Sequence, residues 1–413
     1  MNAIVPPYPR QKLAFGACIL LFGGLIFSKF LLSLSTILLL VLALLSPSPK
    51  GDWKRLLTSK VPWAMIGVFL LFMASSLLSD HQEQTWIRIR IALPMVALPI
   101  AFSLLPTFSK RQYQGLLAVF LGAMTIACLG VLFNYVLNRA EMLDMLKRSQ
   151  AIPTPNGEHI RFSLMINIAL LAGIYLLEKG YYWKQQLERW LMAGSVLFLI
   201  VALHILTVRI GLLVFYANTL LLLLILLIQR RRFKTLVFLL LLFLPMPYLA
   251  YQLVPSIQTK FNLTRYNWQL YRAGEIGEYS DTRRLLSYKI GWEVAQKSPY
   301  WGVGIADLRQ EQAAIYQADY PDQPPMYPHN LFLTLLAGAG IIGLLWFLAC
   351  FFFPLWYYRQ QLDWFFLLIH STIFLSFITE NTLLSTIGVL LYAFFVSVSW
   401  PQYRKETREQ EPS

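Results

Sequence analysis

Long apolar stretches alternate with short polar segments along most of the 413-residue chain. A helix needs roughly 20 apolar residues to cross the hydrocarbon of a bilayer, and only structures that satisfy their own backbone hydrogen bonds are tolerated there. Segments that meet this need, alone or as tight pairs, are residues 13–28, 30–46, 61–79, 93–106, 114–137, 162–179, 190–208, 210–228, 235–253, 330–353, 363–379 and 383–400. The pattern predicts an all-α polytopic membrane protein with about 12 transmembrane helices.

One polar interval is much longer than the others and divides the predicted bundle. We expect nine spans in residues 1–253, a large and partly helical loop in residues 254–328, three further spans in residues 329–400 and a polar tail in residues 401–413. The first apolar run leads into the second without a small-residue cleavage site, which favours a retained span over a signal peptide.

The basic residues indicate which side of the membrane each short loop faces. Hydrophobic residues make up 57% of the chain and charged residues 14%, with a formal net charge of +14. Lys and Arg concentrate in the cytoplasmic loops of membrane proteins. Here they occupy alternate loops, at residues 10–12, 50–60, 110–111, 179–189, 230–234, 359 and 404–408. Both termini are then cytoplasmic, and the basic excess reflects topology rather than a nucleic-acid partner.

The sequence lacks the motifs of cofactor and metal enzymes. No CxxC, HExxH, Walker A or GxGxxG pattern occurs. The cysteines, Cys18, Cys128 and Cys350, all lie in apolar spans, so no disulfide framework is expected. The outward loops contain no clustered acidic pair. We therefore expect neither a cofactor nor a metal.

Isolated cationic residues lie at the ends of spans on the opposite face. Arg88 and Arg90 follow a tryptophan in an isoleucine-rich stretch. This pattern predicts either a short amphipathic helix at the interface or the end of a span with snorkelling arginines. Lys29 lies at the join of the first two spans, and Arg161 lies at the start of the sixth.

Arg209 is the most informative residue among the first nine spans. It lies between two tightly paired apolar runs, LHILTV and IGLLVFY, at or near the membrane boundary. An arginine within the membrane costs roughly 3 kcal/mol on insertion scales and is a functional candidate by default. The alternative is that it anchors to lipid phosphate. His204 and His370 lie deeper in spans, and we interpret both as hydrogen-bonded core residues.

A helix is predicted within the large loop at SDTRRLLSYKIGWEVAQK, residues 280–297. Ser280 or Asp281 is a suitable N-cap. The residues expected on one apolar face are Leu285, Tyr288, Trp292 and Ala295. A proline and two glycines in the following SPYWGVG end the helix.

Two arginines occupy the first turn of this predicted helix. Arg283 and Arg284 lie where cations oppose the helix dipole, so their position has a local cost without a structural reason. An anionic ligand at the helix N-terminus would supply that reason.

His329 directly follows Pro328 at the start of the next predicted span. Proline is compatible with the first turn of a helix, so we expect the imidazole at the positive end of a helix dipole. That field favours the neutral imidazole that a general base needs. Asn330 can orient a neighbour or bind a sugar hydroxyl. The alternative is that His329 is an interfacial residue that caps its helix.

With these residues in place, the chain resembles the O-antigen ligase and O-antigen polymerase family of polytopic membrane glycosyltransferases. Four segments are similar, in order, to the family's motifs: T-V-R-I-G, R-L-L-S-Y-K-I-G-W-E-V-A-Q-K-S-P-Y-W-G-V-G, P-H-N-L-F-L-T-L-L-A-G-A-G-I-I-G-L-L and T-E-N-T-L-L. The combination of P-H-N-L-x-L with G-x-G, spaced by a long loop, is the most specific part. The first half of the chain matches in helix count and hydropathy alone.

The resemblance implies an enzyme of the Gram-negative inner membrane with a periplasmic active site. Its donor would be a glycan on polyprenyl (undecaprenyl) diphosphate and its acceptor the lipid A-core oligosaccharide, without nucleotide, cofactor or metal. Arg209 and Arg284 would hold the diphosphate, with Arg283 as the neighbouring alternative, and His329 would activate the acceptor hydroxyl for inverting transfer. No family motif contains Lys29, Arg88, Arg90 or Arg161, and we expect these four residues to be weaker donor or acceptor contacts. Asn330 and Glu380 are further supporting candidates. Besides these substrates and membrane lipids we expect no partner, and a monomer.

The residue types agree with this chemistry on physical grounds. A diphosphate leaving group gains charge as its bond breaks, and guanidinium groups fixed nearby stabilise that charge. Arginine binds two phosphate oxygens at once through its planar fork, which lysine cannot do.

The sequence leaves other functions open. The same fold can act as an O-antigen polymerase or a protein O-oligosaccharyltransferase, and the shared motifs do not separate these from a ligase. A lipid-linked glycan transporter is the alternative from another class, but the cations gather at one interface rather than along the span interiors. The sequence also leaves open whether Glu380 contacts an arginine, touches sugar or caps its turn.

Overall fold

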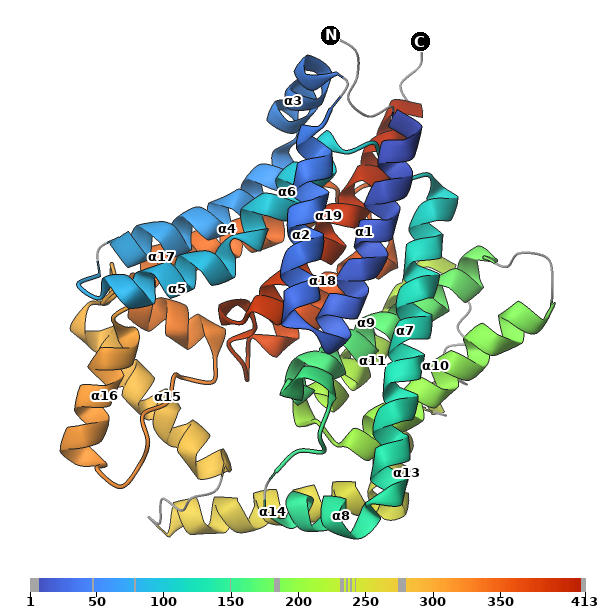
Figure 1. Cartoon of the computed structure of the whole chain (residues 1–413). Helices are drawn as coiled ribbons and strands as arrows, with labels where there is room; N and C mark the ends of the chain where they lie inside the picture. The colour runs from blue at the N-terminus through green and yellow to red at the C-terminus, as the bar shows by residue number, and fades with distance from the viewer. Residues whose placement is uncertain are drawn as a thin grey trace. The chain divides into compact units, whose positions relative to one another are not determined.

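The computed structural model describes residues 7–46, 48–77, 79–148, 150–181, 186–230, 234, 237, 240–241, 243–273 and 280–409. Every regular element within these ranges is a helix, as Figure 1 shows. The predicted all-α class is confirmed.

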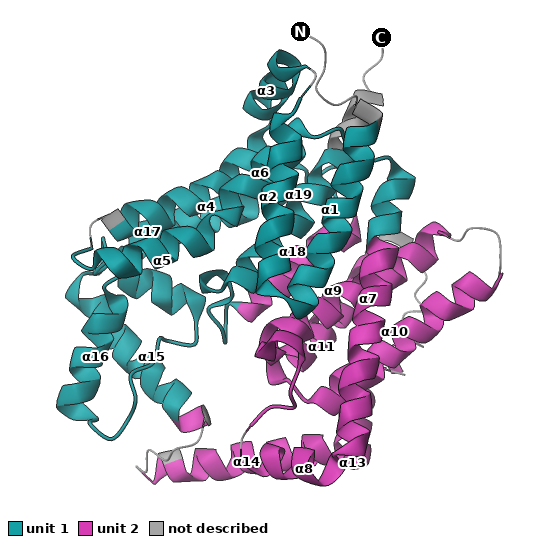
Figure 2. Cartoon of the chain, in the orientation of Figure 1, with its two compact units in different colours: residues 1–116, 283–362, 377–413 teal, residues 117–282, 363–376 magenta. Residues whose placement is uncertain are grey.

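The helices fall into two compact units, which Figure 2 separates by colour and which are described one at a time here. Unit 1 comprises residues 1–116, 283–362 and 377–413, and unit 2 comprises residues 117–282 and 363–376. The helices wholly or mainly in unit 1 are α1 (Pro7–Phe27), α2 (Lys29–Leu44), α3 (Pro49–Thr58), α4 (Lys60–Leu77), α5 (Gln82–Ala92), α6 (Pro94–Leu104), α15 (Ser280–Lys297), α16 (Leu308–Asp319), α17 (Leu331–Tyr357), η2 (Thr382–Leu384) and α19 (Thr386–Glu409). Those wholly or mainly in unit 2 are α7 (Lys110–Leu137), α8 (Arg139–Lys147), η1 (Pro155–Gly157), α9 (His159–Lys179), α10 (Gln186–Leu206), α11 (Arg209–Arg230), α13 (Met246–Leu253), α14 (Pro255–Arg272) and α18 (Trp364–Ser376).

The apolar helices are those of a multi-pass membrane protein. Seven helices in the described residues are long and apolar enough to cross a membrane, or eight if the bent pair α2 and α3 is one span. Three shorter apolar helices are Lys60–Ser76, Trp364–Ser376 and Thr386–Gln402. The predicted span 235–253 lies partly outside the described residues. The number twelve therefore stays a prediction.

One predicted span begins earlier than expected. Helices α5 and α6 form a continuous apolar stretch, Gln82–Leu104, where the sequence predicted a span over 93–106. Pro94 is the first residue of α6, where proline costs no hydrogen bond. Arg88 and Arg90 thus belong to the first part of a spanning stretch, which favours the span-end interpretation over a separate interfacial helix.

Close helix contacts build unit 1. Helix α1 packs on α2, α4 on α17, and α6 on both α2 and α19. Ser28 separates α1 from α2 and accepts a hydrogen bond from Leu31 N–H. A Cβ on Gly24 would lie 2.5 Å from the backbone nitrogen of Leu32, so glycine is what lets the two helices approach at this turn.

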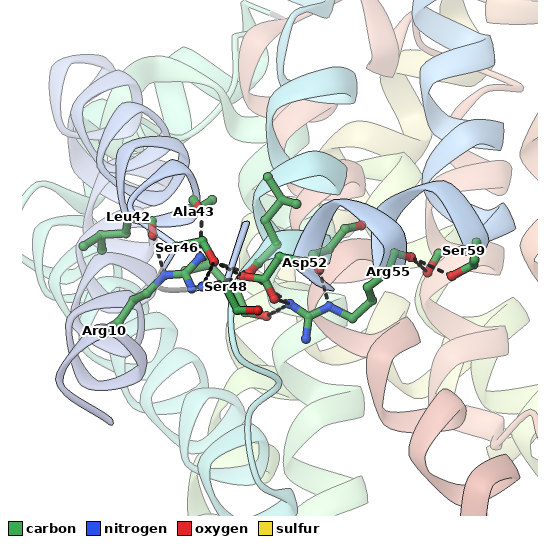
Figure 3. Close-up of polar contacts among 12 residues, drawn as sticks. Arg10, Leu42, Ala43, Ser46, Ser48, Asp52, Arg55 and Ser59 are labelled. Atoms are coloured by element: carbon green, nitrogen blue, oxygen red, sulfur yellow. Dashed lines mark hydrogen bonds and ion pairs between the residues drawn. The ribbon is translucent and has the colours of Figure 1, made fainter. Parts of the chain in front are cut away.

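Arg10 and Arg55 tie helix ends of unit 1 together, as Figure 3 shows for the Asp52 region. Arg10 is fully buried and donates to the carbonyls of Leu42, Ala43 and Leu104 at 2.6–2.9 Å. Arg55 donates to the Leu104 carbonyl at 2.9 Å, and both arginines pair with Asp52. Carbonyls at helix C-termini lack intrahelical donors, so these two cations stabilise the packing of α2 and α6.

The loop after α15 docks into a break in α17. Gly340 has φ 67° and interrupts the helix, and a Cβ there would lie 2.1 Å from the docked loop. Val303 N–H donates to the Ala337 carbonyl and Gly304 N–H to the Gly338 carbonyl, each at 2.9 Å. The P-Y-W-G-V-G segment therefore replaces hydrogen bonds that the break removes, and fixes α15 beside α17.

Unit 2 is built around α9, which packs on α10, α11 and α18. Asn167 of α9 is buried and donates to the Gly211 carbonyl at 3.0 Å, which anchors the start of α11. His204 contacts the Ile200 carbonyl and the Tyr216 hydroxyl at 2.7 and 2.8 Å. His370 lies 3.1 Å from the Phe366 carbonyl and is buried. The interpretation of both histidines as hydrogen-bonded core residues is confirmed.

Candidate functional site

His329 lies in a short non-helical segment that leads into α17. The helix begins at Leu331, and Asn330 is its N-cap, with the side-chain oxygen accepting from Leu333 N–H at 2.9 Å. The prediction that Pro328 lies in the first helical turn is therefore wrong by two to three residues, because Asn330 caps better than a proline-led turn would. Capping is done by Asn330, so His329 is not needed for it.

Amide side chains join the His329 segment to the turn that carries Glu380. Asn330 Nδ2 donates to the Ile378 carbonyl at 3.0 Å, and Asn381 Nδ2 donates to the Pro328 carbonyl at 2.5 Å. Thr334 donates to the Asn381 side chain at 2.9 Å. These bonds link segments about 50 positions apart in the sequence, and they fix the backbone on both sides of His329.

Arg284, Glu380 and His329 form one chain of contacts within unit 1. Nη2 of Arg284 lies 2.8 Å from Oε1 of Glu380, and Oε2 of Glu380 lies 3.6 Å from Nδ1 of His329. The first contact is a hydrogen-bonded ion pair, and the second is too long for a hydrogen bond. Glu380 is buried. A carboxylate on the Nδ1 side favours the tautomer with hydrogen on Nδ1, which leaves Nε2 able to accept a proton.

Tyr288 braces the histidine from α15. Its hydroxyl donates to the His329 carbonyl at 3.0 Å. Burial raises the pKa of the Tyr288 hydroxyl, with Arg284 acting to lower it and Glu380 to raise it. The phenol therefore keeps its proton and remains a donor to the backbone at neutral pH.

Arg88 approaches the same segment from α5. Its Nη2 donates to the Tyr327 hydroxyl at 2.6 Å, and its guanidinium carbon lies 4.9 Å from the Tyr327 ring centroid. The Nε atom is buried and has no hydrogen-bond partner among the described residues. Arg90 of the same helix is exposed. The structure thus brings Arg88, but not Arg90, to the chain next to Pro328.

A second cluster forms in unit 2 around Arg209, the first residue of α11. Thr207, two residues earlier, has φ 50°, a strained conformation for a β-branched residue. Nη1 of Arg209 makes a short ion pair with Asp281. Asn267 of α14 is buried, and its amide lies 3.4 Å from the other Asp281 oxygen. A turn under strain therefore presents Arg209 to a carboxylate.

Lys260 of α14 belongs to the same electrostatic environment. Its Nζ donates to the Gln150 carbonyl at 3.2 Å. Burial, together with the nearby Arg209 guanidinium, lowers the pKa of Lys260 from 10.5 to about 8, although Asp281 acts to raise it. This lysine is therefore mostly protonated at neutral pH and loses its proton as the pH rises through about 8, well below the range in which an exposed lysine does so.

The predicted helix 280–297 is confirmed as α15, but of the four residues predicted on its apolar face only Ala295 is buried. Leu286, Ile290 and Val294 are buried, whereas Trp292 is exposed. The cause is Gly291, where a Cβ would lie 2.6 Å from Pro328 Cγ. This close approach rotates the packed face by about one residue. Ser280, the other predicted N-cap residue besides Asp281, is not among the residues whose side chains the structure describes.

The remaining predicted site residues have local surroundings. Arg283 is next to Arg284, but its Nε is buried without a hydrogen-bond partner in the described part of the chain. Its charge acts to lower the pKa of Tyr316, which burial raises. Arg161 pairs with Glu158 one turn away at 3.5 Å. Lys29 is exposed at the start of α2. The roles predicted for these three residues stay predictions.

Four contributors to the two clusters carried no sequence signal as site residues. Tyr288, Tyr327, Asp281 and Lys260 each contact a segment far away in the chain. In the described residues there is no group of three or more His, Cys, Asp or Glu side chains that could hold a metal ion. Guanidinium groups bind anions and a histidine can transfer protons, and this is the chemistry available to the side chains of the two clusters.

Residues 194–348 match the family model described as O-antigen ligase. This segment of the chain is similar to the O-antigen ligase family. The O-antigen ligase segment runs from α10 into α17 and contains Arg209, Arg284 and His329. Glu380 lies beyond its end. A comparison with curated proteins finds no match.

Proposed function

We propose that this protein is a membrane glycosyltransferase that joins a glycan from a polyprenyl-diphosphate donor to the lipid A-core oligosaccharide. The match of residues 194–348 to the O-antigen ligase model supports transfer of the ligase or polymerase type in general. The observation that carries the more specific proposal is the chain of contacts from Arg284 through buried Glu380 to His329.

In the proposed reaction, His329 is the general base. Nε2 removes the proton of the acceptor hydroxyl as its oxygen forms a bond to the anomeric carbon. The bond from that carbon to the diphosphate oxygen breaks, and its electron pair stays on the diphosphate. Attack opposite the leaving group inverts the anomeric configuration. Glu380 stabilises the imidazolium that forms, as the carboxylate partner does in other histidine-based sites.

The arginines stabilise the leaving group in this proposal. Charge grows on the diphosphate as the bond breaks, and a fixed guanidinium favours that change over the ground state. Arg284 is the phosphate ligand nearest the base, because it shares Glu380 with His329. Arg209 is the second, and its partner Asp281 lies in the same helix as Arg284, three residues earlier. We further propose that the site faces the periplasm of a Gram-negative inner membrane, with both termini cytoplasmic.

Complementation tests this function. Wild type and His329→Ala are expressed in a Gram-negative strain that lacks its O-antigen ligase, and extracted lipopolysaccharide is separated on a gel. The proposal predicts a high-molecular-weight ladder with the wild type and none with His329→Ala, at equal amounts of membrane-inserted protein.

Parallel expression in a strain that lacks its O-antigen polymerase separates the alternatives. Restored glycan length in that strain, without a ladder in the first, would replace the ligase assignment by a polymerase. A lipid-linked glycan that disappears from the inner leaflet without any transfer would favour a transporter. Equal ladders from wild type and His329→Ala would overturn the catalytic role of the histidine.

A further inference from the structure

Helix α14 carries a cation that faces the Arg209 cluster of unit 2. Lys260 is half-buried on this helix, and Asn267, seven residues later, lies on the same face. Ser256 at the start of the helix is buried and donates to the Ile205 carbonyl at 3.0 Å, which ties α14 to the end of α10. The helix is thus fixed next to the strained turn that leads into Arg209.

The charges around Lys260 do not balance within this cluster. The charged groups that act on its ammonium are Arg209 at the start of α11 and Asp281 in α15. The segment that follows α8 contributes a neutral group, the Gln150 carbonyl. Among the residues that the structure describes here, two cations act around the one carboxylate of Asp281, and an excess of positive charge favours a further anion. Asn267, which is 1% exposed, adds a side-chain oxygen without a hydrogen-bond partner among the described residues.

We propose that Lys260 acts with Arg209 as a second cation for the donor, and that the two side chains together bind an oxygen of its diphosphate. This inference rests on the proposed function and adds a residue and a pH response to it. Arginine supplies a planar fork, whereas lysine supplies a compact point charge on a flexible stem. A diphosphate has enough oxygens for both, and the buried Asn267 oxygen can accept a hydrogen bond from a sugar hydroxyl beside it.

The lowered pKa of Lys260 gives the inference a distinctive readout. Only the protonated ammonium attracts phosphate, so its contribution is complete well below pH 8 and is lost as the pH rises through about 8. Removing one charge-assisted hydrogen bond weakens binding by roughly tenfold. We therefore expect donor affinity to fall by about tenfold between pH 7 and pH 9.

The experiment measures binding of geranylgeranyl diphosphate and of the monophosphate to purified protein in nanodiscs. The variants are Lys260→Gln, Lys260→Arg and the matched control Arg265→Gln, which removes one exposed cation from the same helix. Lys260→Gln should weaken diphosphate binding about tenfold at pH 7 and abolish the fall towards pH 9. Lys260→Arg should keep the affinity and also abolish the fall, because arginine stays charged. Arg265→Gln should match the wild type.

Each other outcome has a defined meaning. The inference is overturned if Lys260→Gln binds like Arg265→Gln, or if Lys260→Arg keeps the same fall between pH 7 and pH 9. Equal weakening of diphosphate and monophosphate would also overturn it, since that result indicates general attraction to a charged headgroup. An Arg209→Gln variant tests the proposed function separately. Unchanged diphosphate binding in Arg209→Gln would contradict the proposed donor site. Lost binding in Arg209→Gln, together with normal binding in Lys260→Gln, would contradict only the role of Lys260. Lys260→Arg keeps the test valid if Lys260→Gln fails to fold.

Discussion

The two clusters use the same ion pair, an arginine with a carboxylate, in different surroundings. In unit 1 the Glu380 side chain is 4% exposed and its partner Arg284 is 29% exposed. In unit 2 the corresponding values are 17% for Asp281 and 42% for Arg209. A charge pair that is shielded from water interacts more strongly and is harder to rearrange. This difference agrees with the proposal that the pair beside the histidine keeps a fixed geometry, whereas the Arg209 pair can open to bind an anion.

The supporting structure follows the same division. The His329 segment is held by three amide and hydroxyl side chains and by the Tyr288 hydroxyl. Arg209 instead depends on a turn with a strained Thr207 and on the partly exposed Asp281. A base must be within about 0.5 Å of its productive geometry, whereas a phosphate ligand tolerates adjustment. The more rigid frame thus lies where the proposed proton transfer takes place.

The largest contrast is expected from the two carboxylates. Glu380→Gln removes the charge between Arg284 and His329 and should lower kcat for transfer by about 10²-fold or more. Asp281→Asn, the matched change in unit 2, should alter donor KM by only about threefold, because its pair is more exposed. Steady-state kinetics with a lipid-linked donor measures both. Similar effects of the two variants on kcat would contradict the proposed difference between the two carboxylates.

The next largest effect is expected from the arginines. Lysine keeps the charge but loses the fork that binds two oxygens. Arg284→Lys should therefore reduce kcat/KM by roughly 30-fold, mostly through kcat, and Arg209→Lys by roughly tenfold, mostly through KM. The separate effects on kcat and KM distinguish a role in the transition state from a role in donor binding. If both variants change KM alone, Arg284 binds donor without acting in the transition state.

A smaller effect is expected from the contact between Arg88 and Tyr327. Tyr327→Phe removes one hydrogen bond of about 1 kcal/mol to a charged group and retains the ring. Transfer should fall about fivefold, because the segment before His329 becomes less fixed. Tyr320→Phe, which removes a hydroxyl that contacts Lys289 at 2.9 Å, serves as the control and should change transfer little. Equal effects would make the Arg88 contact unimportant.

The smallest effect concerns the strained turn. Thr207→Gly should relieve about 1 kcal/mol of backbone strain and raise the unfolding temperature by a few degrees. The same change should weaken donor binding slightly, because Arg209 is presented less firmly. Thr207→Ala keeps the positive φ and provides the control in thermal-shift measurements. A lower unfolding temperature for Thr207→Gly than for Thr207→Ala would contradict the assignment of strain.

Much of the fold follows from local properties of the sequence. Apolar length predicts the spans from α7 to α11 within a few residues, and the helix 280–297 has the predicted ends. The start of the span at α5 was not predicted, because Arg88 and Arg90 lower the hydropathy of this stretch. The structure places both arginines in the first part of the apolar stretch Gln82–Leu104. The buried face of α15 was missed because the contact of Gly291 with Pro328 is set by tertiary packing.

The candidate site was predictable to a lesser extent. Single residues with an unusual local environment, Arg209, Arg284 and His329, could be found because charge is costly near a membrane. Their pairings could not, since the sequence left the contact of Glu380 open and indicated Asp281 only as a helix cap. The influence of Arg209 on the pKa of Lys260 depends on how α14 packs, and Tyr288 contacts His329 only because α15 lies beside α17. Contacts of this kind need the three-dimensional structure.

The most direct test separates donor binding from transfer in one protein. Wild type and His329→Gln, purified in nanodiscs, are compared in single-turnover transfer of a labelled glycan and in equilibrium binding of the same lipid-linked donor. The account predicts that His329→Gln binds donor within about twofold of wild type and transfers at least roughly 10³-fold more slowly. Transfer at the wild-type rate would contradict the role of His329 as the base. Loss of binding and transfer together would instead assign the histidine to donor recognition.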